Sequence, residues 1–125
     1  MSQIKITIKN LAQIRSAFVR APRLMTKNLR RAIESTLITI ERQSIINAPR
    51  RTGFLKASHV HRMLSNFSGY VQPTANYAMF VHDGTRFMRA RPFLRQAVAE
   101  KEQEVDRIFA KAVQDTLDEI ARSAS

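Results

Sequence analysis

The sequence predicts a single α+β domain over residues 1–125, with two long helices packed on a small, mostly antiparallel sheet. Two observations carry this prediction. Apolar residues recur at threes and fours over residues 22–47 and again over residues 92–122, which is the spacing of amphipathic helices. Between them, residues 59–72 carry the rough alternation and the turn residues of a β-hairpin. At 44% hydrophobic residues, the 125-residue chain has enough apolar material for one modest core.

The chain is expected to begin with a short strand and a short helix. Residues 3–9 place an isoleucine at every second position, which predicts a strand buried on one face. Asn10 follows as an N-cap, and an amphipathic helix then runs to near Pro22. This helix is either separate from the next one or continuous with it through a bend at Pro22.

The first long helix is predicted over residues 22–47. Pro22 suits its first turn, where a missing N–H has no partner to lose, and the residue before Pro49 is driven out of the helical region. Its basic residues fall mostly off the apolar stripe, which consists of Met25, Leu29, Ile33, Leu37 and Ile40.

Residues 49–58 form a junction, and residues 59–66 are predicted as a strand that is exposed on one side. A turn at residues 66–69 leads into a second strand that stops at Pro73, because proline cannot donate a ladder hydrogen bond. The segment around Tyr77 is either a turn of helix or a short strand.

The last predicted element is one long helix from Pro92 to about Arg122. Lys101 interrupts its apolar stripe once. The stripe consists of Leu94, Ala97, Val98, Val105, Ile108, Phe109, Ala112, Val113, Thr116, Leu117 and Ile120.

Residues 76–97 contain the segment around which the rest of the chain is organised. The chain turns at Asp83-Gly84, a dipeptide that tolerates positive φ, and then enters a basic loop over residues 85–91. Large apolar groups in an irregular loop indicate that it is pinned to the core or to a partner. The arginines either grip phosphates or an acidic neighbour, or they are solvated and cap nearby carbonyls. The candidate interface or DNA-facing residues are Arg86, Phe87, Met88, Arg89, Arg91, Arg95, Arg50 and Arg51.

The charge is large and unevenly distributed. The chain carries 21 basic and 10 acidic residues, for a net charge of +11. Residues 1–95 hold 17 basic and 3 acidic side chains, whereas residues 96–125 hold 4 basic and 7 acidic ones, so a basic body precedes a mildly acidic last helix. The basic body fits DNA, RNA, a lipid surface or the acidic face of a neighbouring subunit, and it also serves solubility alone.

No arrangement of residues indicates an enzyme, a metal site or a cofactor. The chain has no cysteine, and His59 and His61, which share one face of a strand, offer at most a weak metal site. His82 and Asp83 are adjacent, so on a strand their side chains would diverge. The carboxylates of the last helix are expected to be a solvated face, and no phosphate-binding glycine loop occurs.

No apolar run approaches the ~20 residues of a membrane span, and the N-terminus lacks the apolar core of a signal peptide. The sequence therefore predicts that nothing spans a membrane and that the protein stays in the cell that makes it, and no membrane is expected among its partners.

Two blocks resemble the signature of the small neck or tail-completion proteins of long-tailed bacteriophages. The first block is PRRTGFLKAS at residues 49–58, and the second is YAMFVHDGT at residues 77–85, followed by the Arg-Pro-Phe-Leu run at residues 91–94. The chain departs from the family at His82, where the family often has a glutamate, and at Gln96, where it often has a proline. The residues of these blocks given structural roles are Thr52, Gly53, Tyr77, Gly84, Thr85, Pro92 and Phe93.

The resemblance implies a structural virion protein, made in the bacterial host cytoplasm and placed at the head–tail junction or the tail end of a phage or prophage particle. It implies a homo-oligomeric ring in the virion that contacts other neck or tail proteins. The remaining positive charge of such a ring would face a lumen and make non-specific DNA contact there. The chain alone is compatible with a monomer, and the sequence leaves its state before assembly open. A sequence-independent nucleic-acid-binding protein is the second hypothesis. A small enzyme or toxin acting on nucleic acid is the third, and it would need a catalytic cluster that the sequence does not offer.

Overall fold

The computed structural model describes residues 11–50 and 53–124. The predicted strand at residues 3–9, the N-cap Asn10, and Arg51 and Thr52 of the junction lie outside the described residues.

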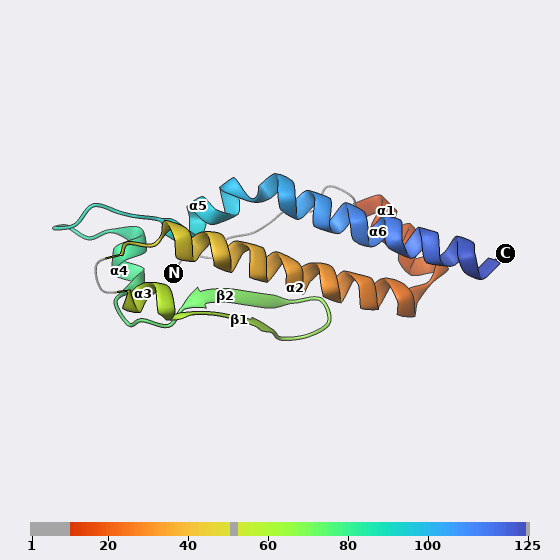
Figure 1. Cartoon of the computed structure of the whole chain (residues 1–125), viewed down its shortest axis with the longest axis horizontal. Helices are drawn as coiled ribbons and strands as arrows, with labels where there is room; N and C mark the ends of the chain where they lie inside the picture. The colour runs from red at the N-terminus through yellow and green to blue at the C-terminus, as the bar shows by residue number, and fades with distance from the viewer. Residues whose placement is uncertain (1–10, 51–52, 125) are drawn as a thin grey trace.

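A single long helix forms the middle layer of an elongated molecule (Figure 1). The β-hairpin lies along one side of this helix, and the two C-terminal helices lie along the other side. The elements in chain order are α1 (Leu11–Arg20), α2 (Pro22–Asn47), α3 (Phe54–Ala57), β1 (His59–Met63), β2 (Gly69–Pro73), α4 (Ala78–Asp83), α5 (Phe93–Glu100) and α6 (Glu102–Ala124). The predicted α+β fold, with two long helices packed on a small antiparallel sheet, is confirmed.

The bounds of α2 are those that its prolines and apolar spacing predict. Pro22 stands in the first turn, and Ala48 adopts an extended conformation (φ −66°, ψ 145°) before Pro49. The buried side chains of the predicted stripe, among them Met25 and Ile40, face the core. Since α2 contacts α5, α6 and both strands, this helix joins the layers into one core.

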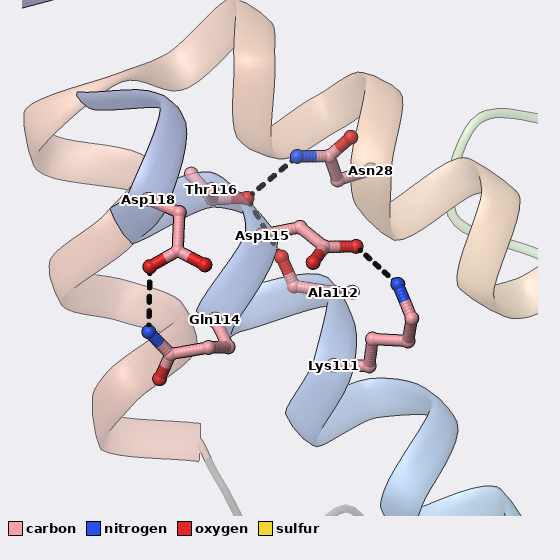
Figure 2. Close-up of polar contacts among 7 residues, drawn as sticks. All are labelled: Asn28, Lys111, Ala112, Gln114, Asp115, Thr116 and Asp118. Carbon is pink, nitrogen blue, oxygen red and sulfur yellow. Dashed lines mark hydrogen bonds and ion pairs between the residues drawn. The ribbon is translucent and has the colours of Figure 1, made fainter. Parts of the chain in front are cut away.

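Buried polar contacts cross between α2 and α6 at Thr116, whose hydroxyl lies 3.4 Å from Met25 Sδ. The Asn28 amide donates to Thr116 Oγ1 at 2.9 Å, and the Thr116 hydroxyl lies 2.8 Å from the Ala112 carbonyl (Figure 2). The outer face of α6 carries ordinary surface pairs, such as Lys111 with Asp115 at 2.9 Å. The buried pair sets the register of the two helices, because apolar neighbours alone would tolerate a small slide.

The hairpin is a two-stranded antiparallel ladder in which His59 lies opposite Pro73 and Met63 lies opposite Gly69. β1 ends earlier than predicted, because the amides of Leu64 and Ser65 both donate to the Ser68 carbonyl and close a turn there. A Cβ on Gly69 would come within 2.6 Å of a Leu37 methyl, so β2 passes close to α2.

Two expectations about helices were wrong. The predicted single helix over residues 92–122 is two helices that meet at Lys101, which closes α5 with φ −102° and ψ 7°. Lys101 is the residue that interrupts the apolar stripe, so burial gives no reason for a straight helix through it. Pro92 is the N-cap of α5 rather than its first helical residue.

The short helix α3 at residues 54–57 was not predicted. Gly53, in the left-handed region at φ 70°, turns the chain into it, and Leu55 then reaches the core. No helix in the part of the chain that the structure describes is long and apolar enough to cross a membrane.

Candidate docking surface

The segment around Tyr77 forms α4, which resolves the open choice between a turn of helix and a short strand. Gly84 ends α4 with φ 79°, as the Asp83-Gly84 turn predicts. A Cβ on Gly84 would lie 2.7 Å from the Ala90 nitrogen and 2.9 Å from its Cα. Gly84 is therefore required both by its backbone conformation and by the returning strand of the loop.

The basic loop is a tight, closed projection at one end of the molecule, between α4 and α5 (Figure 1). Thr85 and Met88 exchange both backbone hydrogen bonds, at 2.9 and 3.3 Å, so that Arg86 and Phe87 form the tip. At the base, the Arg91 amide donates to the Val81 carbonyl at 2.9 Å. The loop is thus ordered by its own backbone hydrogen bonds.

His82 fixes the base of this loop to α5. Its side chain is fully buried, and Nε2 accepts the backbone N–H of Arg95 at 3.2 Å, which places the proton on Nδ1. Arg95 is the third residue of α5, so His82 satisfies an amide that the N-cap Pro92 leaves without a side-chain acceptor. Nδ1–H donates to Asp83 Oδ1 at 2.8 Å, and this hydrogen bond holds the pKa of the Asp83 carboxyl below its usual value.

The prediction that His82 and Asp83 point apart was wrong, because these residues lie at the end of a helix and not on a strand. Edge-on contact with Phe93, at 5.2 Å between ring centroids, completes the environment of His82.

His59 is also a buried histidine whose ring makes hydrogen bonds between elements, here at the start of the hairpin. Its Nε2 lies 2.8 Å from Ser44 Oγ, and its Nδ1 lies 3.1 Å from the carbonyls of Leu55 and Lys56. Burial lowers the pKa of His59, which keeps the ring neutral with Nδ1 as donor and Nε2 as acceptor of the Ser44 hydroxyl. Ser44 is fully buried, so this serine–histidine pair supports the fold and is closed to a substrate.

His59 and His61 do share a face of β1, but they bind different residues of α2. His61 Nδ1 lies 2.9 Å from Glu41 Oε2, whereas His59 contacts Ser44. No group of three or more potential metal ligands comes together among residues 11–50 and 53–124.

The loop and its surroundings expose apolar and basic side chains together. Phe87 is 91% exposed, and the Arg86 guanidinium lies 5.5 Å from the centre of its ring. Phe54, Met79, Phe80 and Met88 are also exposed at this end of the chain's fold. We call the exposed residues of α3, α4 and the loop, together with the adjacent arginines, the loop-end surface: Arg50, Phe54, Met79, Phe80, Arg86, Phe87, Met88, Arg89, Arg91 and Arg95.

A pocket of about 540 Å³ opens at the base of the loop. The described residues that line it are Pro49, Leu55, Tyr77, Val81, Met88, Arg89 and Arg91. The Tyr77 ring also contacts the Phe54 ring, with 6.2 Å between centroids, so the pocket wall continues into the exposed apolar surface.

A second basic surface lies on the two N-terminal helices. No acidic residue occurs from residue 11 to residue 33, and all six basic side chains of this stretch are exposed. Arg30 also donates to Asn66 of the hairpin turn at 2.9 Å. We call this the α1–α2 basic surface, formed by Arg15, Arg20, Arg23, Lys27, Arg30 and Arg31.

The structure brings most of the sequence-predicted interface residues to one end. Residues 86–91 form the loop, Arg50 follows the pocket residue Pro49, and Arg95 is exposed on α5. Among the predicted structural residues, Gly53 and Gly84 adopt positive φ, Tyr77 lines the pocket, and Thr85 closes the loop tip. Pro92 and Phe93 begin α5, where Phe93 is fully buried.

Sequence reasoning missed the roles of His82 and His59 and the pocket residues Pro49 and Leu55. Nothing in the local pattern marks His82 as a helix cap, since the amide that it accepts lies thirteen residues away.

Comparison of the chain with protein-family models, with curated proteins and with solved structures found no match.

Proposed function

We propose that this protein is a structural assembly subunit of a phage or prophage virion, acting at the head–tail junction or at the tail end. The observation that carries the proposal is the loop-end surface, where Phe87 is 91% exposed on a loop whose base is fixed by Gly84, His82 and the Arg91–Val81 hydrogen bond. Val81, Gly84 and Arg91 of this base belong to the blocks that resemble the neck and tail-completion family, whereas His82 is a departure from them.

An ordered loop that presents aromatic and arginine side chains is suited to binding a protein. Phenylalanine, methionine and arginine are enriched in interface cores, and exposed apolar patches rimmed by polar groups mark interaction sites. Because the loop is already closed by its own hydrogen bonds, binding a partner costs little ordering entropy. The two buried histidines, His82 and His59, hold a helix end and a strand end, so neither presents its ring on this surface.

A ring is the assembly that the charge distribution supports. Exposed acidic residues of α6, such as Glu102 and Glu104, can face a basic surface of the next copy in a head-to-tail contact. Other neck or tail proteins then bind the loop-end surface, and the protein is monomeric until it meets them.

The experiment that tests the proposal is deletion of the gene from the phage or induced prophage that encodes it, with negative-stain electron microscopy of the lysate. We expect filled heads and separate tails that fail to join, or tails of abnormal form. Normal infectious particles would contradict a structural role in the virion.

Complementation of the deletion sharpens the test. A Phe87→Ser gene is expected to restore few joined particles, because the tip loses its exposed aromatic side chain. Leu64→Ser is the matched control, since Leu64 is 66% exposed on the hairpin turn, away from the loop. Equal rescue by both genes would show that the exposed Phe87 side chain is not needed for particle assembly.

A sequence-independent nucleic-acid-binding protein is the second candidate, and the α1–α2 basic surface favours it. These six cations, from a stretch (residues 11–33) that holds no acidic residue, would contact phosphates and release counterions, so DNA affinity would fall steeply with salt. In the ring, the same contact would let DNA pass without base recognition. Fluorescence anisotropy with a random duplex across a salt series tests this candidate, and Arg23→Glu together with Lys27→Glu should abolish the binding.

A further inference from the structure

The pocket at the base of the loop combines an apolar floor with a basic rim. Five of its lining residues are apolar or aromatic: Pro49, Leu55, Tyr77, Val81 and Met88. Its volume of about 540 Å³ lies within the range of sites that enclose small organic groups, and it is large enough for an aromatic side chain.

The other two lining residues, Arg89 and Arg91, supply only positive charge. No ion pair joins either guanidinium to an acidic side chain in the described part of the chain. The nearest carboxylate along the chain, Asp83, already accepts the hydrogen bond from His82. The rim therefore has cationic donors available for carboxylates of a ligand.

Among residues 11–50 and 53–124, the two most exposed apolar side chains do not match such a ligand. Both lie beside basic residues, Phe87 beside Arg86 and Val19 beside Arg20. A second copy that inserted one of them would place arginine against arginine. The acidic residues of α6 lie on a helix whose large apolar side chains, such as Val105 and Phe109, are buried in its own core.

We propose that the pocket binds a segment of a different protein in which a large apolar side chain is flanked by carboxylates. The apolar side chain enters between Leu55, Tyr77 and Val81, and the carboxylates pair with Arg89 and Arg91. This inference rests on the proposed function, since it gives the chemistry of the protein that docks on the loop-end surface.

The test uses the full chain and a fluorescein-labelled peptide of sequence Glu-Asp-Phe-Asp-Glu, with binding followed by fluorescence anisotropy. The expected result is saturable binding that weakens about tenfold when serine replaces the phenylalanine of the peptide, because the serine peptide buries much less apolar surface in the pocket. A Lys-Arg-Phe-Arg-Lys peptide should not bind. Absence of binding by the acidic aromatic peptide, or equal binding of the serine peptide, would overturn the proposal.

The location is tested with charge reversal. Arg89→Glu together with Arg91→Glu should weaken binding of the acidic peptide about tenfold or more, while the same change at Arg15 and Arg20 leaves it within about twofold. Equal losses in both variants would show general attraction to a basic protein and contradict a pocket.

Methyl NMR shifts give a readout on the unaltered protein. The methyl signals of Leu55, Val81 and Met88 should shift on peptide addition, and shifts confined to other methyl groups would overturn the assignment of the binding site to this pocket.

Complementation separates this inference from the function on which it rests. If deletion of the gene blocks assembly and the Arg89→Glu, Arg91→Glu gene fails to restore it, both are supported. If that gene restores assembly fully, the structural role stands and the pocket proposal is wrong. If deletion leaves particles normal, the structural role fails, whatever the peptides show.

Discussion

The α2–α6 interface and the loop region between α4 and α5 bury side chains in different ways. Along α2 and α6, many apolar residues repeat at helical spacing, so the contact depends on a pattern more than on any one residue. The loop region depends on single contacts: the glycine at residue 84, the imidazole of His82 and the ring of Phe93. A repeated pattern makes a stable body, and a few specific contacts allow that body to present a defined loop to a partner.

The largest expected effects on stability come from replacing one buried phenylalanine in each region. Phe93 is fully buried between the rings of His59 and His82, at 5.7 and 5.2 Å, and Phe109 is buried in α6. Phe93→Ala and Phe109→Ala should each lower the free energy of unfolding by about 3–5 kcal/mol in denaturant titrations.

Hydrogen exchange tells the two variants apart. The amides of Arg91 and Arg95 donate at the loop base, so Phe93→Ala should speed their exchange more than Phe109→Ala does. Equal acceleration in the two variants would mean that the loop base unfolds only with the whole domain. The loop region would then not depend on its own local contacts.

Gly84→Ala is expected to have the next largest effect. The added methyl group meets the Ala90 backbone at 2.7 Å in a residue with φ 79°, so the free energy of unfolding should fall by about 2–4 kcal/mol. Gly53→Ala is the matched control, since Gly53 has a similar φ of 70° but open space around its Cβ position, and it should cost about 1–2 kcal/mol. Thermal and denaturant unfolding measure both, and equal losses would show that crowding by Ala90 contributes nothing.

Thr116→Val tests the buried hydrogen bond between Asn28 and Thr116 in the α2–α6 interface. The substitution keeps the shape of the side chain but leaves the buried amide of Asn28 without its acceptor, at a cost of about 1–3 kcal/mol. Adding Asn28→Leu removes the unsatisfied group and should recover part of the loss. If the double variant is no more stable than Thr116→Val, the amide of Asn28 has another acceptor or water available.

The long helices could be predicted from the sequence because their stabilisation is periodic. The positions of Met25 and Val105 in their stripes already indicate which side of each helix is buried, and the structure buries both. The break at Lys101 marks the limit of this reasoning, since the sequence showed an interrupted stripe but gave no reason for a change of helix direction.

The candidate site could be predicted only in part. The Asp83-Gly84 turn and the apolar–basic loop are local signals, and both appear in the structure. The cap from His82 to Arg95 and the pocket wall contributed by Leu55 join residues that are distant along the chain. Such contacts depend on how the elements pack, which a local pattern does not encode.

The smallest expected effect concerns the pH dependence of stability. Burial lowers the pKa of His59 below its ordinary value of 6.5, so the unfolded chain takes up a proton there before the folded chain does. The stabilisation is complete well above pH 6.5 and is lost as the pH falls through and below that value, by at most about 1.4 kcal/mol per pH unit. Urea titrations from pH 8 to pH 5 should show this slope.

Substitution assigns that slope to one of two neighbouring histidines. His59→Gln lowers stability but removes the part of the slope due to His59, because glutamine does not titrate. His61→Gln is the matched control, as His61 lies two residues away on the same strand with a half-exposed ring bonded to Glu41. If His61→Gln flattens the slope and His59→Gln does not, the pH dependence of stability comes from the exposed face of the hairpin. The buried contacts of His59 with α2, α3 and Phe93 would then not control the pH dependence of stability.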